Sequence, residues 1–252
     1  MSSPGCQRLL LRQWKALPSE RFGSASAIHA RFLEWERDGV FRALWQAGMA
    51  EYDEMEGIAW RWQSIDGALV KAPLAQESVG ANPTDRGGNG SKRMLLVDAH
   101  GIPLSLIVSG ANWHDVSQLG ATLDAFVVPR PPVTPRTPQH LWADAGFVGI
   151  PALNEMLAQD YTPHVRPRGE ERTERSRGTR ARRWVVEVAL SWFNRFRKLL
   201  VRYEKTHRAY LALTMLAAAI ICFRHVPGKV NIVYGKVLIL HPRYVAAGTV
   251  GG

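Results

Sequence analysis

Three acidic side chains are placed along the sequence where they could take part in one reaction. Asp66 lies near the end of an expected strand, Asp144 ends a later strand, and Glu187 lies on the polar row of a long expected helix. Carboxylate oxygens are the hard ligands that Mg²⁺ binds, and one or two carboxylates per ion suffice because the ion keeps several waters. Two ions about 4 Å apart can activate the attacking oxygen and stabilise the leaving oxygen of a displacement at phosphorus. The three acids therefore predict metal-dependent phosphoryl transfer if the fold brings them together.

Hydrophobic periodicity and turn residues predict the elements that would position these acids. In the first half of the chain we expect two short helices over 25–45, a strand within 60–70 that ends at Gly67, a loop over 77–92, a hairpin of strands 93–98 and 104–109, and a helix over 115–126 that opens on a capping box at Asp115. In the second half we expect a strand over 140–144, a helix over 151–159, an extended piece over 162–166, an arginine-rich loop over 167–179, a long helix over 182–200 and a buried helix over 209–223. The periodically placed tryptophans are expected in the core: Trp142, Trp184 and Trp192. This order is typical of an α/β sheet covered by helices, and 252 residues suit one such domain.

Positive charge is concentrated in one stretch of the chain. Of the formal net charge of +10, the stretch from Tyr161 to Arg208 carries +9, with 14 Lys or Arg against 5 Asp or Glu. Basic surface gains most from a polyanion whose phosphates release condensed counterions, so nucleic acid is the first candidate partner. The alternative for the arginines between Arg166 and Arg183 is a solvated loop that contacts no phosphate.

Several classes of protein are disfavoured by the sequence. Cys6 and Cys222 are far apart and indicate neither a disulfide framework nor a CxxC metal pair, which favours a reducing compartment. Arginines interrupt the leucines near the amino terminus, unlike a secretory signal, and the apolar run over 211–223 is shorter than the roughly 20 residues that span a bilayer. The glycine-rich stretch 87–92 lacks the ending of a nucleotide-binding loop. We therefore expect a cytoplasmic, nucleoid-associated protein without a membrane partner or a nucleotide cofactor.

Six short blocks of the chain carry a family resemblance. They are Trp62–Gly67 (WQSIDG), Asn82–Gly87 (NPTDRG), Gly110–Asp115 (GANWHD), Gln139–Phe147 (QHLWADAGF), His164–Gly169 (HVRPRG) and Arg182–Glu187 (RRWVVE). In order and spacing these blocks resemble those of bacterial and archaeal insertion-sequence transposases of the IS-five group. The resemblance extends from about Leu17 to about Arg224.

The resemblance implies a fold, a reaction and partners. The fold would be RNase H-like, a mixed α/β sheet flanked by helices with a short helical amino-terminal segment. Asp66, Asp144 and Glu187 would be the family's DDE triad, holding two Mg²⁺ or Mn²⁺ ions for DNA cleavage at element ends and strand transfer into target DNA. Family members work in synaptic complexes, which implies a homo-oligomer on DNA. His114 and Asp115 match a block that would support the site, and phosphate contacts are expected for Arg86, Lys92, Arg166, Arg168, Arg180, Arg183, Arg195 and Lys198.

The sequence also departs from the family's pattern. Only a short stretch precedes Phe22, where typical members have a longer helical DNA-binding region, and Asn194 stands in the place of a lysine of the motif around the glutamate. The expected units are a truncated helical segment over 1–57, a catalytic domain over 58–225 and an atypical tail over 226–252. Two alternatives stay open: an inactive remnant that only binds DNA, and a related nuclease that hydrolyses strands without joining them.

Overall fold

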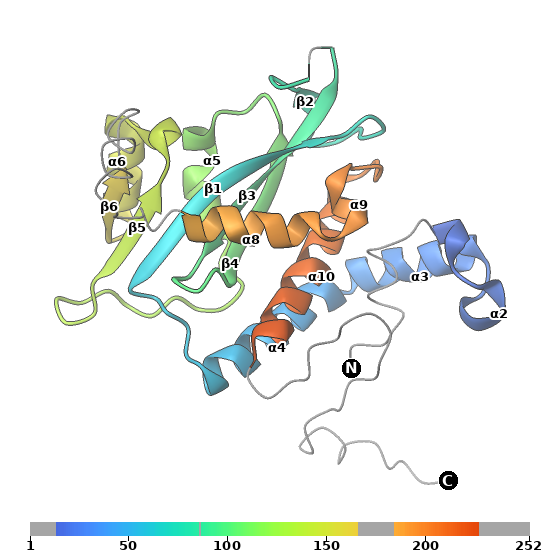
Figure 1. Ribbon diagram of the computed structural model, residues 1–252, viewed down its shortest axis with the longest axis horizontal. Helices are drawn as coiled ribbons and strands as arrows, with labels where there is room; N and C mark the ends of the chain where they lie inside the picture. The colour runs from blue at the N-terminus through green and yellow to red at the C-terminus, as the bar shows by residue number, and fades with distance from the viewer. Residues whose placement is uncertain (1–13, 86, 166–183, 227–252) are drawn as a thin grey trace, which may run out of the picture.

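A mixed sheet forms the centre of the computed structural model, which describes residues 14–85, 87–165 and 184–226 (Figure 1). The strands are β1 (Trp62–Lys71), β2 (Gly80–Ala81), β3 (Asn89–Val97), β4 (Pro103–Gly110), β5 (Gln139–Ala143) and β6 (Tyr161–Val165). β3 is antiparallel to both β1 and β4, whereas β5 and β6 continue the sheet beyond β1 as parallel strands. The expected strands and the α/β class are confirmed.

The direction of each strand follows from the connection before it. A short turn joins β3 to β4, as an antiparallel pair requires. α6 (Ile150–Ala158) joins β5 to β6, and a helical crossover of this kind returns the chain parallel to the preceding strand. α5 (Asp115–Asp124) lies between β4 and β5 and packs against α6. β1 and β5 come from distant parts of the chain and are neighbours in the sheet.

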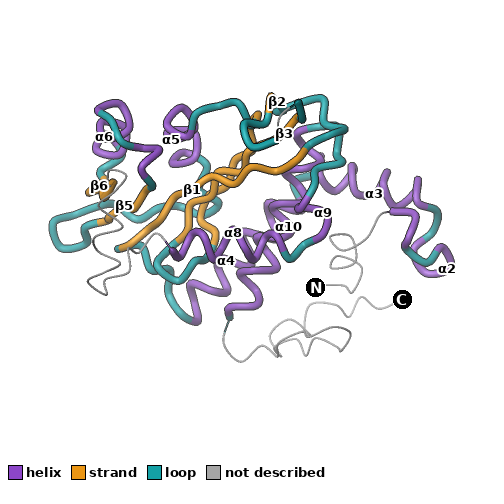
Figure 2. The backbone as a smooth tube through the Cα atoms, turned by 45° about the horizontal axis from the view of Figure 1, so that its top comes forward, coloured by secondary structure: helices purple, strands orange, loops and turns teal. Residues whose placement is uncertain are grey.

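Helices cover both faces of the sheet. Figure 2 shows α5 and α6 on one side of the strands, and α4 (Val40–Met55), α8 (Trp184–Asn194) and α10 (His207–His225) on the other. By length and composition α10 could cross a membrane, but 67% of its apolar window is buried inside the structure, so it serves as a core helix. The buried helix expected over 209–223 is thus confirmed. The smaller helical elements are η1 (Trp14–Ala16), α2 (Ser19–Phe22), α3 (Ala25–Arg37), η2 (Ala145–Phe147) and α9 (Arg197–Leu200).

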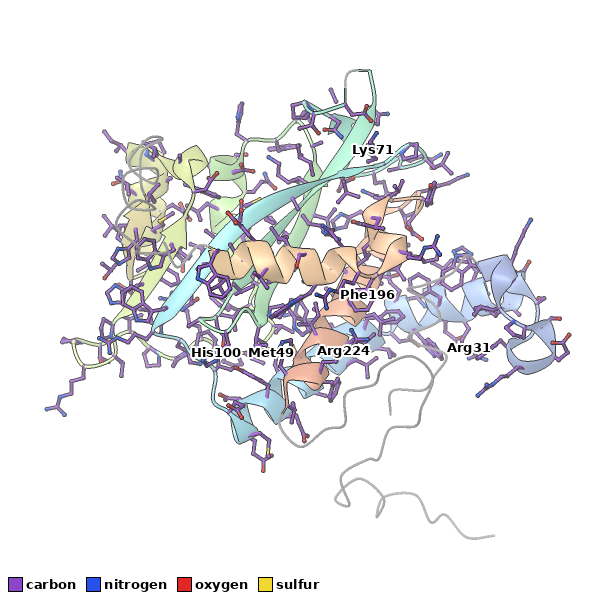
Figure 3. All side chains as sticks on the ribbon, in the orientation of Figure 1. Arg31, Met49, Lys71, His100, Phe196 and Arg224 are labelled. Atoms are coloured by element: carbon purple, nitrogen blue, oxygen red, sulfur yellow. The ribbon has the colours of Figure 1, made fainter. Side chains whose placement is uncertain are left out.

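α4 packs closely against α10 at a glycine. A Cβ at Gly48 would lie 3.2 Å from Cys222 Cβ and 3.3 Å from the carbonyl oxygen of Ala219. Met49, labelled in Figure 3, and Trp45 are buried beside this contact. The helices of the expected amino-terminal segment therefore share the hydrophobic core with α10.

Three expected boundaries differ in the structure. β1 continues to Lys71, so Asp66 lies in the middle of the strand rather than near its end. β3 begins at Asn89, inside the expected loop, because its pairing with β1 extends as far as Lys71 opposite Gly90. The capping box predicted at Asp115 is wrong, because the N-cap is His114 and the Asp115 carboxylate is bound to Lys92 instead.

The long helix expected over 182–200 is interrupted after Asn194. Arg195 and Phe196 donate backbone hydrogen bonds to carbonyls three residues back, and α9 follows this turn. The turn allows Phe196 to be buried together with the inner face of α8, which consists of Val186, Ala189, Leu190 and Phe193. Trp184, at the other end of α8, is 44% exposed, so its expected place in the core is wrong. The arginine-rich loop expected over 167–179 and the tail beyond Val226 lie outside the described residues.

The contact at Gly48 gives a test of the α4–α10 packing. Gly48→Leu should lower the free energy of unfolding by about 1–3 kcal/mol, because the added side chain has no room against α10. Ala50→Leu, at an exposed position of the same helix, should change it by less than about 0.5 kcal/mol. Urea unfolding of both variants measures the difference, and equal stabilities would contradict the described contact.

Candidate active site

Asp66 and Asp144 are carried by neighbouring parallel strands. Trp62 pairs with His140, and Ser64 pairs with Trp142. Continuing this register by two residues places Asp66 opposite Asp144, which directly follows β5. Side chains alternate between the faces of a sheet, so both aspartates belong to the same face. With backbones about 4.8 Å apart, two such carboxylates can share a cation.

A buried hydrogen-bond network fixes this register. Gln63 Nε2 donates to Gln139 Oε1 at 2.9 Å and to the Trp60 carbonyl at 2.9 Å. Tyr161 of β6 donates its hydroxyl to Gln63 Oε1 at 2.7 Å, and Arg130 Nε donates to Gln139 Oε1 at 2.7 Å. Burial raises the pKa of Tyr161, which keeps its hydroxyl a donor. A slip of one residue would leave these buried amides without partners, so the network aligns β1, β5 and β6.

Each aspartate is oriented by the backbone N–H of a nearby glycine. Asp66 Oδ1 accepts from Gly67 at 2.7 Å, and Asp144 Oδ1 accepts from Gly146 at 2.7 Å. Asp144 is also the N-cap of η2, and the buried ring of Phe147 anchors that short helix. Each of the two carboxylates thus accepts a hydrogen bond from the backbone of its own segment.

Glu187 approaches the sheet from α8. This helix packs on β1 and β3, over the face that carries Asp66, and Figure 1 shows it lying along β1. Its far end is fixed by Arg93, which lies opposite Ala68 and donates to Asn194 Oδ1 at 2.9 Å and to the Leu199 carbonyl at 3.4 Å. Glu187 lies two turns before Asn194 on the same side of the helix. Glu187 is exposed. It lies at the start of α8, on the same side of the helix as Asn194, which bonds to Arg93 at the end of α8.

The oxygen donors suit a hard divalent cation. Two carboxylates on one face are the ligand type that Mg²⁺ takes while keeping several waters. Within residues 14–85, 87–165 and 184–226, no group of three or more His, Cys, Asp or Glu side chains could hold a metal ion. Continued by two residues, the sheet register aligns Asp66 with Asp144, whereas Glu187 does not join them in a three-ligand cluster within the described residues.

The two residues expected to support the site differ in their surroundings. His114 is exposed and caps α5 without a side-chain hydrogen bond. Asp115 Oδ1 accepts from Lys92 Nζ at 2.6 Å, and Lys92 also donates to the Trp113 carbonyl at 2.6 Å. Lys92, which we expected at a phosphate, is only 10% exposed and lies in this internal ion pair.

The other expected phosphate contacts are distributed unevenly. Arg195 is exposed at the end of α8. Lys198 forms an ion pair with Glu204 at 3.0 Å and is 13% exposed, so its ammonium group is held within the protein. The remaining predicted contacts lie outside the described residues: Arg86, Arg166, Arg168, Arg180 and Arg183.

An aromatic and imidazole cluster lies on the same sheet face as the aspartates. Trp62 stacks on His140 with ring centroids 4.1 Å apart, and Trp142 stacks on His164 at 4.6 Å. His140 Nδ1 and His164 Nε2 are 3.0 Å apart. Trp142 is therefore half-buried in a surface cluster rather than in the core. The spacing of two residues between Trp142 and Asp144 could have revealed the shared face.

Asp98 directly follows β3 and belongs to the hairpin turn. Its buried carboxylate accepts from the backbone N–H groups of His100 and Ile102 at 2.9 Å and of Ala59 at 3.2 Å. Burial raises the pKa of the Asp98 carboxyl, and the three N–H donors oppose that shift. Figure 3 labels His100 in this turn, which packs on α4 through a 2.8 Å hydrogen bond between Tyr52 Oη and His100 Nδ1. Asp98 closes a turn and is separate from the Asp66–Asp144 pair.

Comparisons of the sequence point to transposases. The family model described as "Transposase DDE domain" matches residues 63–222. The putative transposase for insertion sequence element IS402 of Burkholderia cepacia is 34% identical over 150 residues, which are 57% of this chain and 68% of that protein. The sheet has the order β2-β3-β1-β5-β6 with β4 also paired to β3, and this mixed sheet flanked by helices agrees with the expected RNase H-like class.

Solved structures similar to this chain include two of the Mos1 transposase. They are the paired-end complex with left transposon end and the pre-cleavage transpososome. Each is 12% identical with a TM-score of 0.33, and the matches cover 87% and 86% of this chain and 76% of each Mos1 chain. The family assignment comes from the sequence matches.

The bond between Arg93 and Asn194 gives a test of how α8 is held. Asn194→Ala should lower the free energy of unfolding by about 1.5–3 kcal/mol, because a buried guanidinium loses an acceptor. Ser191→Ala, at an exposed position of α8, should change it by less than about 0.5 kcal/mol. Denaturant unfolding measures both values. A loss at Asn194 no larger than the loss at Ser191 would show that Arg93 does not fix this helix.

Proposed function

Because this chain belongs to the family of proteins that carry the transposase DDE domain, we propose that it cuts and joins DNA strands with Asp66, Asp144 and Glu187 as its catalytic acids. The reaction consists of two displacements at phosphorus. Water attacks at the end of an insertion sequence, and the freed 3'-hydroxyl then attacks target DNA. We assign the chain to the IS-five group within this family, and the resemblance of the six sequence blocks supports this assignment.

One observation carries the assignment of the site. The β1–β5 register brings Asp66 and Asp144 to adjacent positions on one face. The glycine N–H groups hold both carboxylates in place before any substrate arrives. In a preorganised site of this kind, no free energy is spent on rearranging the carboxylates during the reaction.

The chain's own residues have separable tasks in this proposal. Asp66 and Asp144 would hold the cations, and Glu187 would supply a third carboxylate from α8. Two Mg²⁺ or Mn²⁺ ions held there would supply Lewis-acid stabilisation of the attacking and leaving oxygens. Arg195, exposed at the end of α8, contacts the phosphate backbone beside the site.

The partners follow from charge and from the reaction. The net charge of +10 favours DNA through release of its counterions. Joining an element to a target requires two element ends and the target in one complex, so we propose that the chain acts as a homo-oligomer on DNA. It would act on DNA in the cytoplasm, at the nucleoid.

Removing one carboxylate tests the catalytic assignment. Asp144→Asn and Asp66→Asn should each slow Mg²⁺-dependent nicking of element-end DNA about 1,000-fold or more, because each removes several kcal/mol of charge stabilisation. Glu187→Gln should act in the same direction. Asp124→Asn, an exposed position at the end of α5, is the matched control and should nick like the unmodified protein.

The measurement is a gel assay on labelled oligonucleotides with each variant confirmed to be folded. Equal nicking by Asp144→Asn and Asp124→Asn would disprove the site. No nicking by the unmodified protein, with intact DNA binding, would favour the inactive remnant.

Chelation and strand transfer test the metal and the second step. EDTA should abolish nicking, and added Mg²⁺ or Mn²⁺ should restore it, because the carboxylates alone cannot stabilise the leaving oxygen. Pre-cleaved element ends with a free 3'-hydroxyl should yield joined products on target DNA. Nicking without joined products would support the hydrolytic nuclease instead.

A further inference from the structure

One carboxylate faces two glycines that lie beside the candidate catalytic aspartates. A Cβ at Gly67 would lie 3.1 Å from Asp115 Oδ1, and a Cβ at Gly146 would lie 3.5 Å from Asp115 Oδ2. Gly67 directly follows Asp66 in β1, and Gly146 lies in the turn that Asp144 caps. The two oxygens of Asp115 therefore pack on two separate segments at the same time.

Asp115 reaches β1 from the face opposite Asp66. Neighbouring residues of a strand point to opposite faces, so the Gly67 side of β1 faces away from the side that carries Asp66. A side chain on Gly67 would meet Met94 Sδ at 2.7 Å as well as Asp115. Glycine at this position leaves the space that the Asp115 carboxylate occupies.

Lys92 holds Asp115 in this space. Lys92 lies opposite Leu69 in the β1–β3 ladder, which places it on the same face as Gly67. Its ammonium group is 2.6 Å from Asp115 Oδ1 and 2.6 Å from the Trp113 carbonyl oxygen. Asp115 is also the first residue of α5, where the helix dipole favours a negative charge. The Lys92 ammonium group, which the Trp113 carbonyl holds in place, and the helix end therefore restrict the rotation of this carboxylate.

We propose that Lys92 and Asp115 form a positioning clamp, which sets the spacing between Asp66 and Asp144 from behind the sheet. Neither clamp residue contacts DNA or metal in this assignment. The inference rests on the proposed function, because it assigns Asp66 and Asp144 as the metal-binding pair. It also assigns Lys92 to the interior rather than to a phosphate.

A second ion pair of the same kind provides a matched comparison. Lys198 and Glu204 are 3.0 Å apart with side chains 13% and 8% exposed, so this pair is at least as buried as the clamp. It joins α9 to the segment before α10 and touches neither Gly67 nor Gly146. Glu204→Gln therefore reproduces the loss of a buried ion pair without the loss of a clamp.

Amide exchange and Mn²⁺ binding test the clamp on the full chain without DNA. The Gly67 and Gly146 amides donate to Asp66 and Asp144, so their hydrogen exchange by NMR reports the two carboxylates directly. Asp115→Asn should speed exchange at both amides and weaken Mn²⁺ binding about 10- to 100-fold, the range for residues that orient metal ligands. Asp115→Glu should do the same, because its longer side chain keeps the charge but cannot fit between the two glycines.

The controls separate the possible outcomes. Glu204→Gln should leave both amides and the Mn²⁺ affinity as in the unmodified protein. If Asp115→Asn and Asp115→Glu behave like Glu204→Gln, or if Asp115→Glu restores normal behaviour, the pair is an ordinary stabilising ion pair and the clamp is disproved. Failure of the unmodified protein to nick DNA would overturn the proposed function, yet it would leave the exchange result at Gly67 and Gly146 to decide the clamp.

Discussion

The parallel pairing of β1 with β5 is the constraint on which the site depends. The ladder is short, from Trp62 opposite His140 to Ser64 opposite Trp142, and it joins parts of the chain separated by a hairpin and a helix. Gln63 and Gln139 are buried inside it and bond to one another. Buried amides tolerate few alternative partners, so this pair specifies one register and rejects the neighbouring ones. The placement of Asp66 beside Asp144 follows from that choice.

Backbone groups and buried side chains restrict the segments that carry the pair. Glycine N–H groups orient each carboxylate, the ring of Phe147 anchors the turn after Asp144, and Asp115 packs behind both segments. Glu187 is different, because it comes from a helix that is fixed at its far end by Arg93. Sites on strands keep their geometry better than sites on connecting segments. The positions of Asp66 and Asp144 are thus set by the sheet, whereas the position of Glu187 depends on how α8 packs on it.

Much of this architecture could be predicted from local patterns. Alternating side chains identified β1 and β5, and the six blocks identified the family and the candidate acids. The errors arose where a distant partner decided the outcome. Asp115 has the local form of a cap, but Lys92 takes its carboxylate. The helix period runs through Asn194, but burying Phe196 requires a turn there. Nor does sequence spacing show that Lys92 lies inside the protein, because its burial is set by the pairing of β3 with β1 and the approach of α5.

The central claim is that one cation is shared by the carboxylates of Asp66 and Asp144. A crystal of the full chain soaked in Mn²⁺ and measured at the manganese absorption edge tests it most directly. The account predicts an anomalous peak bonded to an oxygen of each aspartate. A peak bound to one of them alone, or manganese found elsewhere with this face empty, would contradict it.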